Sequence, residues 1–577
     1  MKVLSKIFIL SVILLFVSCT KRNPLVGGPK ILHVPLSGEI STVDPANSYD
    51  TISASIIYQC YEQLYQYHYL KRPYTLEPLL AKSLPEITNN GKTYTIKIKE
   101  GIKYHDHKAF NGTPRFVKAQ DFITQIKRLA FIPTQSNGWW LFDGRIVGLN
   151  EFRNKVKSNF ELFQKTDVKG LSAPDDHTLV INLTETYPQM LFSLAMSFTS
   201  PVPLEVVISE NNILNRTIVG TGPFKLESLN LLSEVVLNKN PEYRDAFYPK
   251  QGDRMANIKG LLEDAGKKIP FIDGIKFSVI KEAQTRWLNF RKKNIDLLVI
   301  PKDNYTSAID PSGKLTDELK KEKVKLQVFP TLTYWWLGFN MQDKILGNNK
   351  NLRLAIAHAV DVTKYIQVFT NNIGLKSNSI YPPGIPGYDP SSKLPYEYNL
   401  EKAKAFLTKA GYPDGKGLPA LNYDVRGTSA TNKQQGEFIK TQLEKLGIQV
   451  NVILNTFPSF LKKSKNGKLQ FWQDGWALDY PDAENVLQLL VTKNHSPGPN
   501  STYYSNPKFD KLFNELKKLP EGPKKHKLMK EMEKYILEDL PWVMQYFARN
   551  YILHHDRLKN FRHSDLIYNH MKYLEID

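Results

Sequence analysis

The feature that most constrains the fold is a helix, a single glycine and an apolar strand that follow one another directly. Residues 434–446 are predicted to form the helix, Gly447 the turn, and 448–454 the strand. A helix that returns through a tight glycine turn into an apolar strand is typical of α/β architecture. We therefore predict an α/β fold for the second half of the chain.

Periodic patterns predict further elements along the chain. Residues 94–99 alternate between polar and apolar side chains, as a half-buried strand does, and 118–129 carry apolar residues on one helical face. Helix 399–410 begins after the capping residue Asn399 and ends at Gly411. Helices are also predicted at 52–69 and 351–370, strands at 31–36, 178–183, 232–238 and 274–280, and a surface-loop insertion at 251–269.

The N-terminal residues predict export. Lys2 and Lys6 flank the start of an apolar run at 7–17, which is too short to cross a bilayer because a span takes about 20 residues. Cys19 follows at a position that resembles a bacterial lipobox, although Phe16 replaces the usual leucine. We predict a signal peptide at 1–18, lipidation of Cys19 and a tether at 19–30. The alternative is an ordinary signal peptide with an incidental cysteine.

The length of the chain bounds the number of domains, and its charge bears on whether it binds nucleic acid. A chain of 577 residues is too long for one ordinary core, so we expect two or three domains. The net charge of +20 is scattered along the chain, and no nucleic-acid-binding module is recognisable. We predict a solvated basic surface and no nucleic-acid partner. Two cysteines, Cys19 and Cys60, do not make a disulfide framework.

The short motifs that suggest chemistry are incomplete. Gly220-Thr-Gly222 lacks the later glycine of a dinucleotide fingerprint and the lysine of a phosphate loop. His105 and His107 would share one face of a strand, so a metal site there is an alternative to a structural role. We predict no catalytic residue, no cofactor and no metal site.

Six sequence strings, in matching order and spacing, resemble the family-5 solute-binding proteins of bacterial transporters, a class that includes oligopeptide-binding proteins. The strings lie at 42–46 with 61–64, 78–106, 220–224, 352–361, 401–415 and 476–482.

This resemblance implies a two-lobed, periplasmic-binding-protein-like α/β fold, with an extra subdomain inserted in the first lobe. It also implies oligopeptides and the membrane permease subunits of an ABC transporter as partners. We expect a monomer in the periplasm or at the cell surface, held to a membrane by the lipid. The predicted limits are 31–61, 191–333 and 545–577 for lobe I, 62–190 for the insert, and 334–544 for lobe II.

The sharpest candidate site residue is Asp479. In peptide-binding relatives the acid of this loop pairs with the α-amino group of the peptide, and the alternative is a turn or capping residue. The basic residue that some relatives carry near the ligand reads here as Gln473. The other predicted ligand-binding residues are Trp476, Phe457, Tyr49 and Tyr334, each with a core or surface role as the alternative. A metal chelate or an oligosaccharide stays open as the solute, and an exported hydrolase is the rival from another class.

Overall fold

The computed structural model describes residues 28–496 and 498–577. The predicted signal peptide, Cys19 and most of the tether 19–30 lie outside the described residues. Among the helices described, none is both long enough and apolar enough to cross a membrane.

The first sheet joins distant parts of the chain. Its β1 pairs in parallel with β10, β10 pairs antiparallel with β9, and β9 with β8. Helix α1 (Thr51–Cys60) contributes Ile56 and Ile57 to the core over this sheet. The strands are β1 (Ile31–Leu36), β8 (Phe224–Asn230), β9 (Glu234–Lys239) and β10 (Gly274–Val279).

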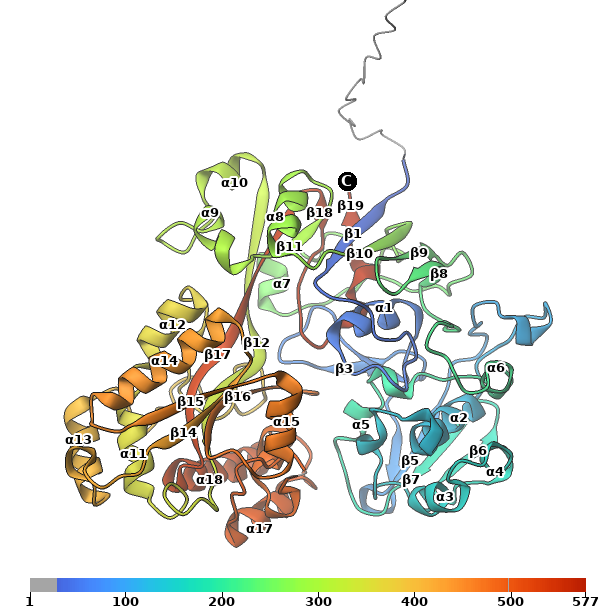
Figure 1. Cartoon of the computed structure of the whole chain (residues 1–577). Coiled ribbons are helices and arrows are strands. Elements are labelled where there is room, and N and C mark those ends of the chain that lie inside the picture. The colour runs from blue at the N-terminus through green and yellow to red at the C-terminus, as the bar shows by residue number, and fades with distance from the viewer. Residues whose placement is uncertain (1–27, 497) are drawn as a thin grey trace, which may run out of the picture.

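A separate antiparallel sheet lies in the segment predicted as the insert. Its order is β4-β5-β7-β6, and Phe122, Ile126 and Leu129 of α2 contribute to the core that covers it. Figure 1 places this part at the lower right. Its elements are β4 (Glu86–Thr88), β5 (Thr93–Lys97), α2 (Ala119–Ala130), α3 (Leu149–Val156), α4 (Phe160–Lys165), β6 (Leu171–Asp175) and β7 (Thr178–Asn182). Helices α5 (Met190–Ser193) and α6 (Leu204–Ser209) add residues to the same core, although they extend past the predicted limit at 190.

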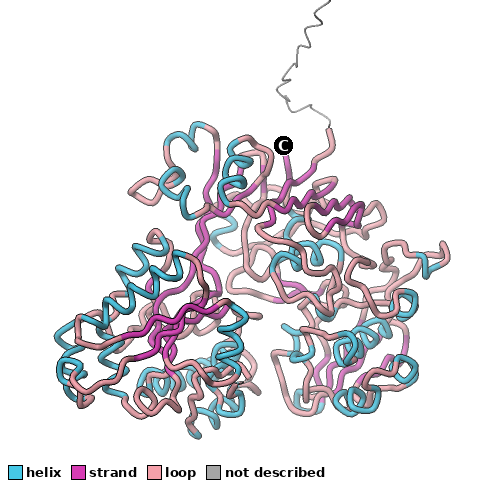
Figure 2. Tube along the Cα trace, in the orientation of Figure 1, coloured by secondary structure: helices cyan, strands magenta, loops and turns pink. Residues whose placement is uncertain are grey.

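The third sheet has seven strands, in the order β11-β17-β12-β16-β14-β15 with β13 beside β17. Helices lie on both of its faces, as Figure 2 shows, and the fold is α/β as predicted. The strands are β11 (Leu297–Val299), β12 (Val324–Phe339), β13 (Leu375–Lys376), β14 (Leu421–Arg426), β15 (Val450–Asn455), β16 (Phe471–Ala477) and β17 (Trp542–His555). The helices around them are α11 (Lys350–Ala359), α12 (Val362–Thr370), α13 (Leu400–Lys409), α14 (Ala430–Glu444), α15 (Phe457–Lys465), α16 (Ala483–Leu487), α17 (Pro507–Leu516) and α18 (Pro523–Asp539).

Two long strands connect the lobes. β12 and β17 run antiparallel from Val324, opposite His555, to Gly338, opposite Trp542. Figure 1 shows them running from the region of α8 (Ala283–Arg291), α9 (Tyr305–Ala308) and α10 (Asp317–Lys321) into the lobe that holds β14–β16. The register shifts between Pro330 and Tyr334. The predicted lobe limits at 333/334 and 544/545 fall inside these strands, and they stay a prediction.

Two predicted helices differ from the structure. The segment 52–69 is helical only to Cys60, and Tyr65–Tyr67 then forms strand β2 with Tyr65 and Tyr67 buried on one face. The segment 351–370 is divided into α11 and α12, because Asp361 caps a new helix by accepting a hydrogen bond from the backbone N–H of Lys364 (2.9 Å).

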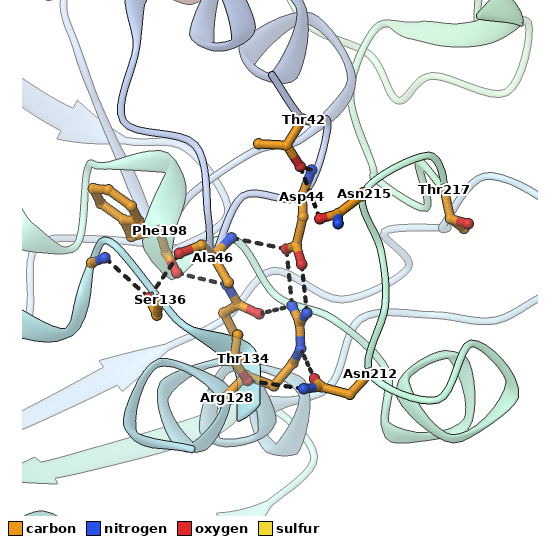
Figure 3. Close-up of polar contacts among 12 residues, drawn as sticks. Thr42, Asp44, Ala46, Arg128, Thr134, Ser136, Phe198, Asn212, Asn215 and Thr217 are labelled. Atoms are coloured by element: carbon orange, nitrogen blue, oxygen red, sulfur yellow. Dashed lines mark hydrogen bonds and ion pairs between the residues drawn. The ribbon is translucent and has the colours of Figure 1, made fainter. Parts of the chain in front are cut away.

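A buried ion pair fastens the first lobe to the inserted part. Arg128, on α2, donates to both carboxylate oxygens of Asp44 (2.7 and 3.2 Å), and the two residues are 0% and 1% exposed. Arg128 also donates to Gln125 (3.0 Å) and Asn212 (2.8 Å). Figure 3 shows Arg128 between Asp44 and Asn212. Because the guanidinium fork is filled with matched acceptors, this pair is geometrically specific.

The glycines of Gly220-Thr-Gly222 serve packing. A Cβ on Gly220 would lie 1.9 Å from the carbonyl oxygen of Cys60, at the end of α1. His105 is buried against the same turn: its backbone N–H donates to Gly220 (2.8 Å), and its Nε2 bonds the carbonyl oxygen of Gly222 (3.1 Å). Burial lowers the pKa of His105 to about 4, so its ring is neutral near pH 7. These contacts give His105 a structural role.

Candidate functional site

Asp479 lies where the two lobes meet, in the loop between β16 and α16. Tyr49, from the first lobe, donates its hydroxyl to Oδ1 (2.8 Å), and Asn485 donates its side-chain amide to Oδ2 (3.0 Å). Burial raises the pKa of Asp479, while the hydrogen bonds from Asn485 and Tyr49 oppose the shift. No described lysine, arginine or histidine lies within 4.0 Å of this carboxylate. The arrangement is therefore a half-buried carboxylate held by neutral donors, which a cation would complement.

Asn485 links two of the predicted site residues. Its Oδ1 accepts from Trp476 Nε1 (3.0 Å) and from the backbone N–H of Asp479 (3.2 Å). Asn485 is fully buried on α16, so the position of the Asp479 carboxylate depends on the helix behind it. No sequence pattern predicts a site role for Asn485, because that role depends on how α16 packs.

Tyr49 crosses between the lobes from an exposed position. Its side chain is 52% exposed, and its ring lies 5.9 Å from that of Phe198 and 6.4 Å from that of Trp140 (centroid to centroid). The structure thus places two predicted residues, Tyr49 and Asp479, in direct contact.

A second inter-lobe contact lies beside the first. Phe192 stacks on Tyr480 with a centroid separation of 5.5 Å, and the hydroxyls of Tyr187 and Tyr480 are 3.3 Å apart. Tyr187 belongs to the segment predicted as the insert, and Phe192 lies two residues beyond its predicted limit. Tyr480 follows Asp479 directly in the chain, so this aromatic contact and the Tyr49–Asp479 contact involve the same loop of the second lobe.

A cavity of about 330 Å³ lies on the second lobe. Gln473 lines it, but its Oε1 accepts from the Tyr365 hydroxyl (2.9 Å) and its Nε2 donates to Gln545 (2.5 Å). The polar atoms of Gln473 are therefore already bonded within the lobe. The other lining residues are Trp335, Tyr423, Val425, Arg426, Asn432, Gln435 and Tyr546.

Among the described residues that line this cavity, Arg426 alone is cationic. It pairs with Asp474 (3.0 Å), and its guanidinium carbon lies 4.6 Å from the centroid of the Phe457 ring. Burial raises the pKa of Asp474, and the charge of Arg426 opposes the shift. Phe457, 46% exposed, thus joins the predicted site through Arg426. In the sequence, the position expected to carry a basic residue is 473, which is a glutamine. The basic residue of this cavity is Arg426, at the end of β14, and no sequence pattern predicts it.

Tyr334 lies in the interior and not on this cavity. It is 0% exposed, and its ring lies 5.2 Å from that of Trp336 and 6.3 Å from that of Trp542. Its neighbour Trp335 points to the other face of β12 and lines the cavity. The Trp335 ring lies over Gly475 of β16, where an added Cβ would lie 2.7 Å from it. Only glycine at 475 leaves room for the indole.

Relatives of this chain are bacterial binding proteins. Heme-binding protein A of Haemophilus influenzae is 25% identical over 538 residues, which is 92% of this chain and 86% of the relative. The dipeptide-binding protein of Escherichia coli is 25% identical over 469 residues, 79% of this chain and 78% of the relative. The structure of the Helicobacter pylori periplasmic binding protein DppA in complex with the peptide STSA is similar, with a TM-score of 0.72, 25% identity, and coverage of 95% of this chain and 98% of that one.

The family profile described as bacterial extracellular solute-binding proteins, family 5 Middle, matches residues 75–498. That match covers more than half of the chain and includes Asp479, Trp476, Phe457 and Gln473. The two-lobed fold agrees with it, because solved peptide-binding relatives share this architecture. The chain belongs to the bacterial extracellular solute-binding proteins of family 5.

Proposed function

We propose that this protein captures short peptides between its lobes and delivers them to the permease of an ABC transporter. The observation that carries the proposal is Asp479, a half-buried carboxylate with no described cationic partner, at the junction of the lobes. The α-ammonium group of a peptide supplies the missing charge, and the attraction is strongest where water is excluded. Two of the similar proteins, the dipeptide-binding protein of Escherichia coli and the peptide-bound DppA of Helicobacter pylori, support a peptide as the solute.

Arg426 is the proposed partner for the opposite end of the peptide. A guanidinium group binds a carboxylate in a bidentate geometry, and Arg426 lines a cavity that also offers the aromatic rings of Trp335 and Tyr423. In this assignment a peptide carboxylate competes with Asp474 for Arg426, and Gln473 positions Tyr365 rather than the ligand.

Incubation with mixed peptides tests the function. After gel filtration, mass spectrometry of the protein fraction is expected to find intact peptides with free ends, because both termini carry the binding charges. The same peptides amidated at the C-terminus are expected to be depleted from that fraction, since they lack the group that Arg426 binds. Cleaved products would instead indicate a hydrolase. Retention of a haem or another non-peptide solute would replace peptides as the ligand while leaving the binding role in place.

We propose that the protein is exported and anchored as a monomer through a lipid on Cys19. The Cys19→Ser variant is expected to leave the membrane fraction or to stay unprocessed, because a serine carries no thioether-linked lipid. Fractionation with immunoblotting measures both outcomes. A variant that is processed and fractionates like the parent rules out lipidation at Cys19.

A further inference from the structure

A further cavity, of about 550 Å³, shares no lining residue with the cavity of about 330 Å³ on the second lobe. It lies on one face of the hairpin formed by β2 (Tyr65–Tyr67) and β3 (Leu76–Pro78). Gln66 lines the cavity, whereas the flanking Tyr65 and Tyr67 point to the opposite face, as alternate residues of a strand do. Tyr67 packs there against Phe192, which stacks on Tyr480 at the inter-lobe contact. The hairpin therefore separates this cavity from the contact between the lobes.

The charged residues that line this cavity are mostly cationic. The lysines are Lys71, Lys99, Lys250 and Lys572, and none of them forms an ion pair with a described carboxylate. Two of the other charged lining residues pair with residues outside the cavity: Arg244 donates to both oxygens of the buried Glu62 (2.5 and 2.8 Å), and Asp245 pairs with Lys268 (2.6 Å). Glu77 accepts from Gln66 (2.7 Å) and lies 4.0 Å from Nε2 of His68, and both of these partners also line the cavity.

Lys572 is a buried lysine at this cavity, and it is the strongest indication of an anion-binding site. It is 2% exposed, at the C-terminal 3₁₀ segment Tyr568–Tyr573, and its Nζ donates to Gln66 Oε1 (3.0 Å). Burial lowers the pKa of Lys572 to about 8; the charges of Glu62 and Glu77 oppose the shift, while those of Arg244 and Lys99 add to it. The Nζ also lies 5.1 Å from the centroid of the Tyr573 ring. A buried ammonium is costly unless it is paired with an opposite charge, so an anion in the cavity would stabilise Lys572.

We propose that this cavity binds a small soluble molecule with two or more oxyanion groups, phosphate or carboxylate. Lys572 and Lys99 meet one group in the buried part. The more accessible Lys71 and Lys250 meet another, because the chain at Gly252 lies against Leu70 and brings these two segments together. The cavity is larger than a single oxyanion requires, and four unpaired lysines favour a multivalent ligand.

Calorimetric titration of the full mature chain with pyrophosphate, citrate and inorganic phosphate tests the proposal. Pyrophosphate or citrate is expected to bind with a Kd below about 1 mM, and inorganic phosphate at least tenfold more weakly, because it carries a single group. Whichever of the two multivalent anions binds more tightly identifies the group as phosphate or carboxylate. Equal, weak binding of all three would mean an adventitious ion only, and would overturn the proposal.

Lys572→Met separates a binding role from a structural one. Without anion the variant is expected to have the same Tm as the parent or a higher one, because it removes a buried charge that lacks a carboxylate partner. With pyrophosphate or citrate, the rise in Tm seen for the parent is expected to disappear. Lys165→Met, at an exposed lysine of α4, is the matched control and is expected to keep the rise.

A loss of Tm in Lys572→Met together with unchanged anion binding would overturn the proposal, since Lys572 would then stabilise the fold without binding an anion. Should this variant fail to fold, the double variant Lys71→Met with Lys250→Met gives the same test, because both side chains are more accessible. At least a tenfold loss of affinity for the multivalent anions supports the site, and unchanged affinity contradicts it.

Discussion

Arg128→Met is expected to lower the free energy of unfolding by about 3–5 kcal/mol, the cost of leaving one partner of a buried ion pair uncompensated. Asp44 is 1% exposed, and in the variant its carboxylate keeps only the hydrogen bond from the backbone N–H of Ala46 (2.9 Å). Gln125 and Asn212 each lose a donor as well. Urea denaturation followed by circular dichroism measures the loss.

Two further variants identify the cause of that loss. Arg216→Met, at an exposed arginine with no described ion pair, is expected to change the free energy of unfolding by less than about 0.5 kcal/mol. Arg128→Met combined with Asp44→Asn is expected to recover part of the loss, because the stranded carboxylate charge is gone. If Arg128→Met costs less than about 1 kcal/mol, the pair does not fasten the insert to the first lobe.

Asp479→Asn is expected to weaken peptide binding by about 2–5 kcal/mol, or roughly tens- to thousands-fold in Kd, with the fold intact. The amide keeps the shape of the side chain and can still meet Tyr49 and Asn485, but it offers no charge to the ammonium of the peptide. Part of the loss is the cost of leaving that ammonium desolvated. Titration calorimetry with a peptide retained by the parent gives the difference.

An N-acetylated peptide, tested on the parent and on Asp479→Asn, shows whether the carboxylate and the α-amino group contact each other. N-acetylation is expected to weaken binding to the parent but to add little on Asp479→Asn, because both changes remove the same interaction. Tyr49→Phe is the matched control: it removes one neutral hydrogen bond to Asp479 and keeps the ring, so a smaller loss of about 0.5–1.5 kcal/mol is expected. If acetylation has no effect on the parent, or if the two losses simply add, Asp479 is a turn residue and not the amine anchor.

The helices with local signals at both ends could be predicted from the sequence. Helix 399–410 is confirmed as α13, where the Asn399 side chain accepts from the backbone N–H of Lys402 (2.9 Å). The helix predicted at 52–69 is wrong after Cys60. Its tyrosines fit a helical period and a strand period equally well over so short a run. Tertiary packing selects the strand in this segment, because it buries Tyr65 and Tyr67 on one face of β2.

The candidate site was harder to predict, because it joins residues whose contact depends on register. The alternation of side chains along β12 put Tyr334 and Trp335 on opposite faces, but it could not say which face meets solvent. Arg426 reaches Phe457 and Asp474 only because β14 pairs with β15 and β16 in one particular alignment. Pairings across strands leave little trace in a single sequence.

The interrupted register of β12 has a mechanical consequence. Between the pairs Pro330–Arg549 and Tyr334–Phe547, β12 advances four residues while β17 advances two, so the ladder of backbone hydrogen bonds is broken at this point. Proline at 330 has no N–H to contribute, and the N–H of Leu332 is donated to Asp565 instead (2.8 Å). A two-stranded ribbon is most compliant where its ladder is interrupted, and the register shifts again between Trp335 and Trp336. Bending at this point would rotate one lobe relative to the other. Trp335, which lines the cavity of the second lobe, is the first residue after Tyr334, where the pairing resumes.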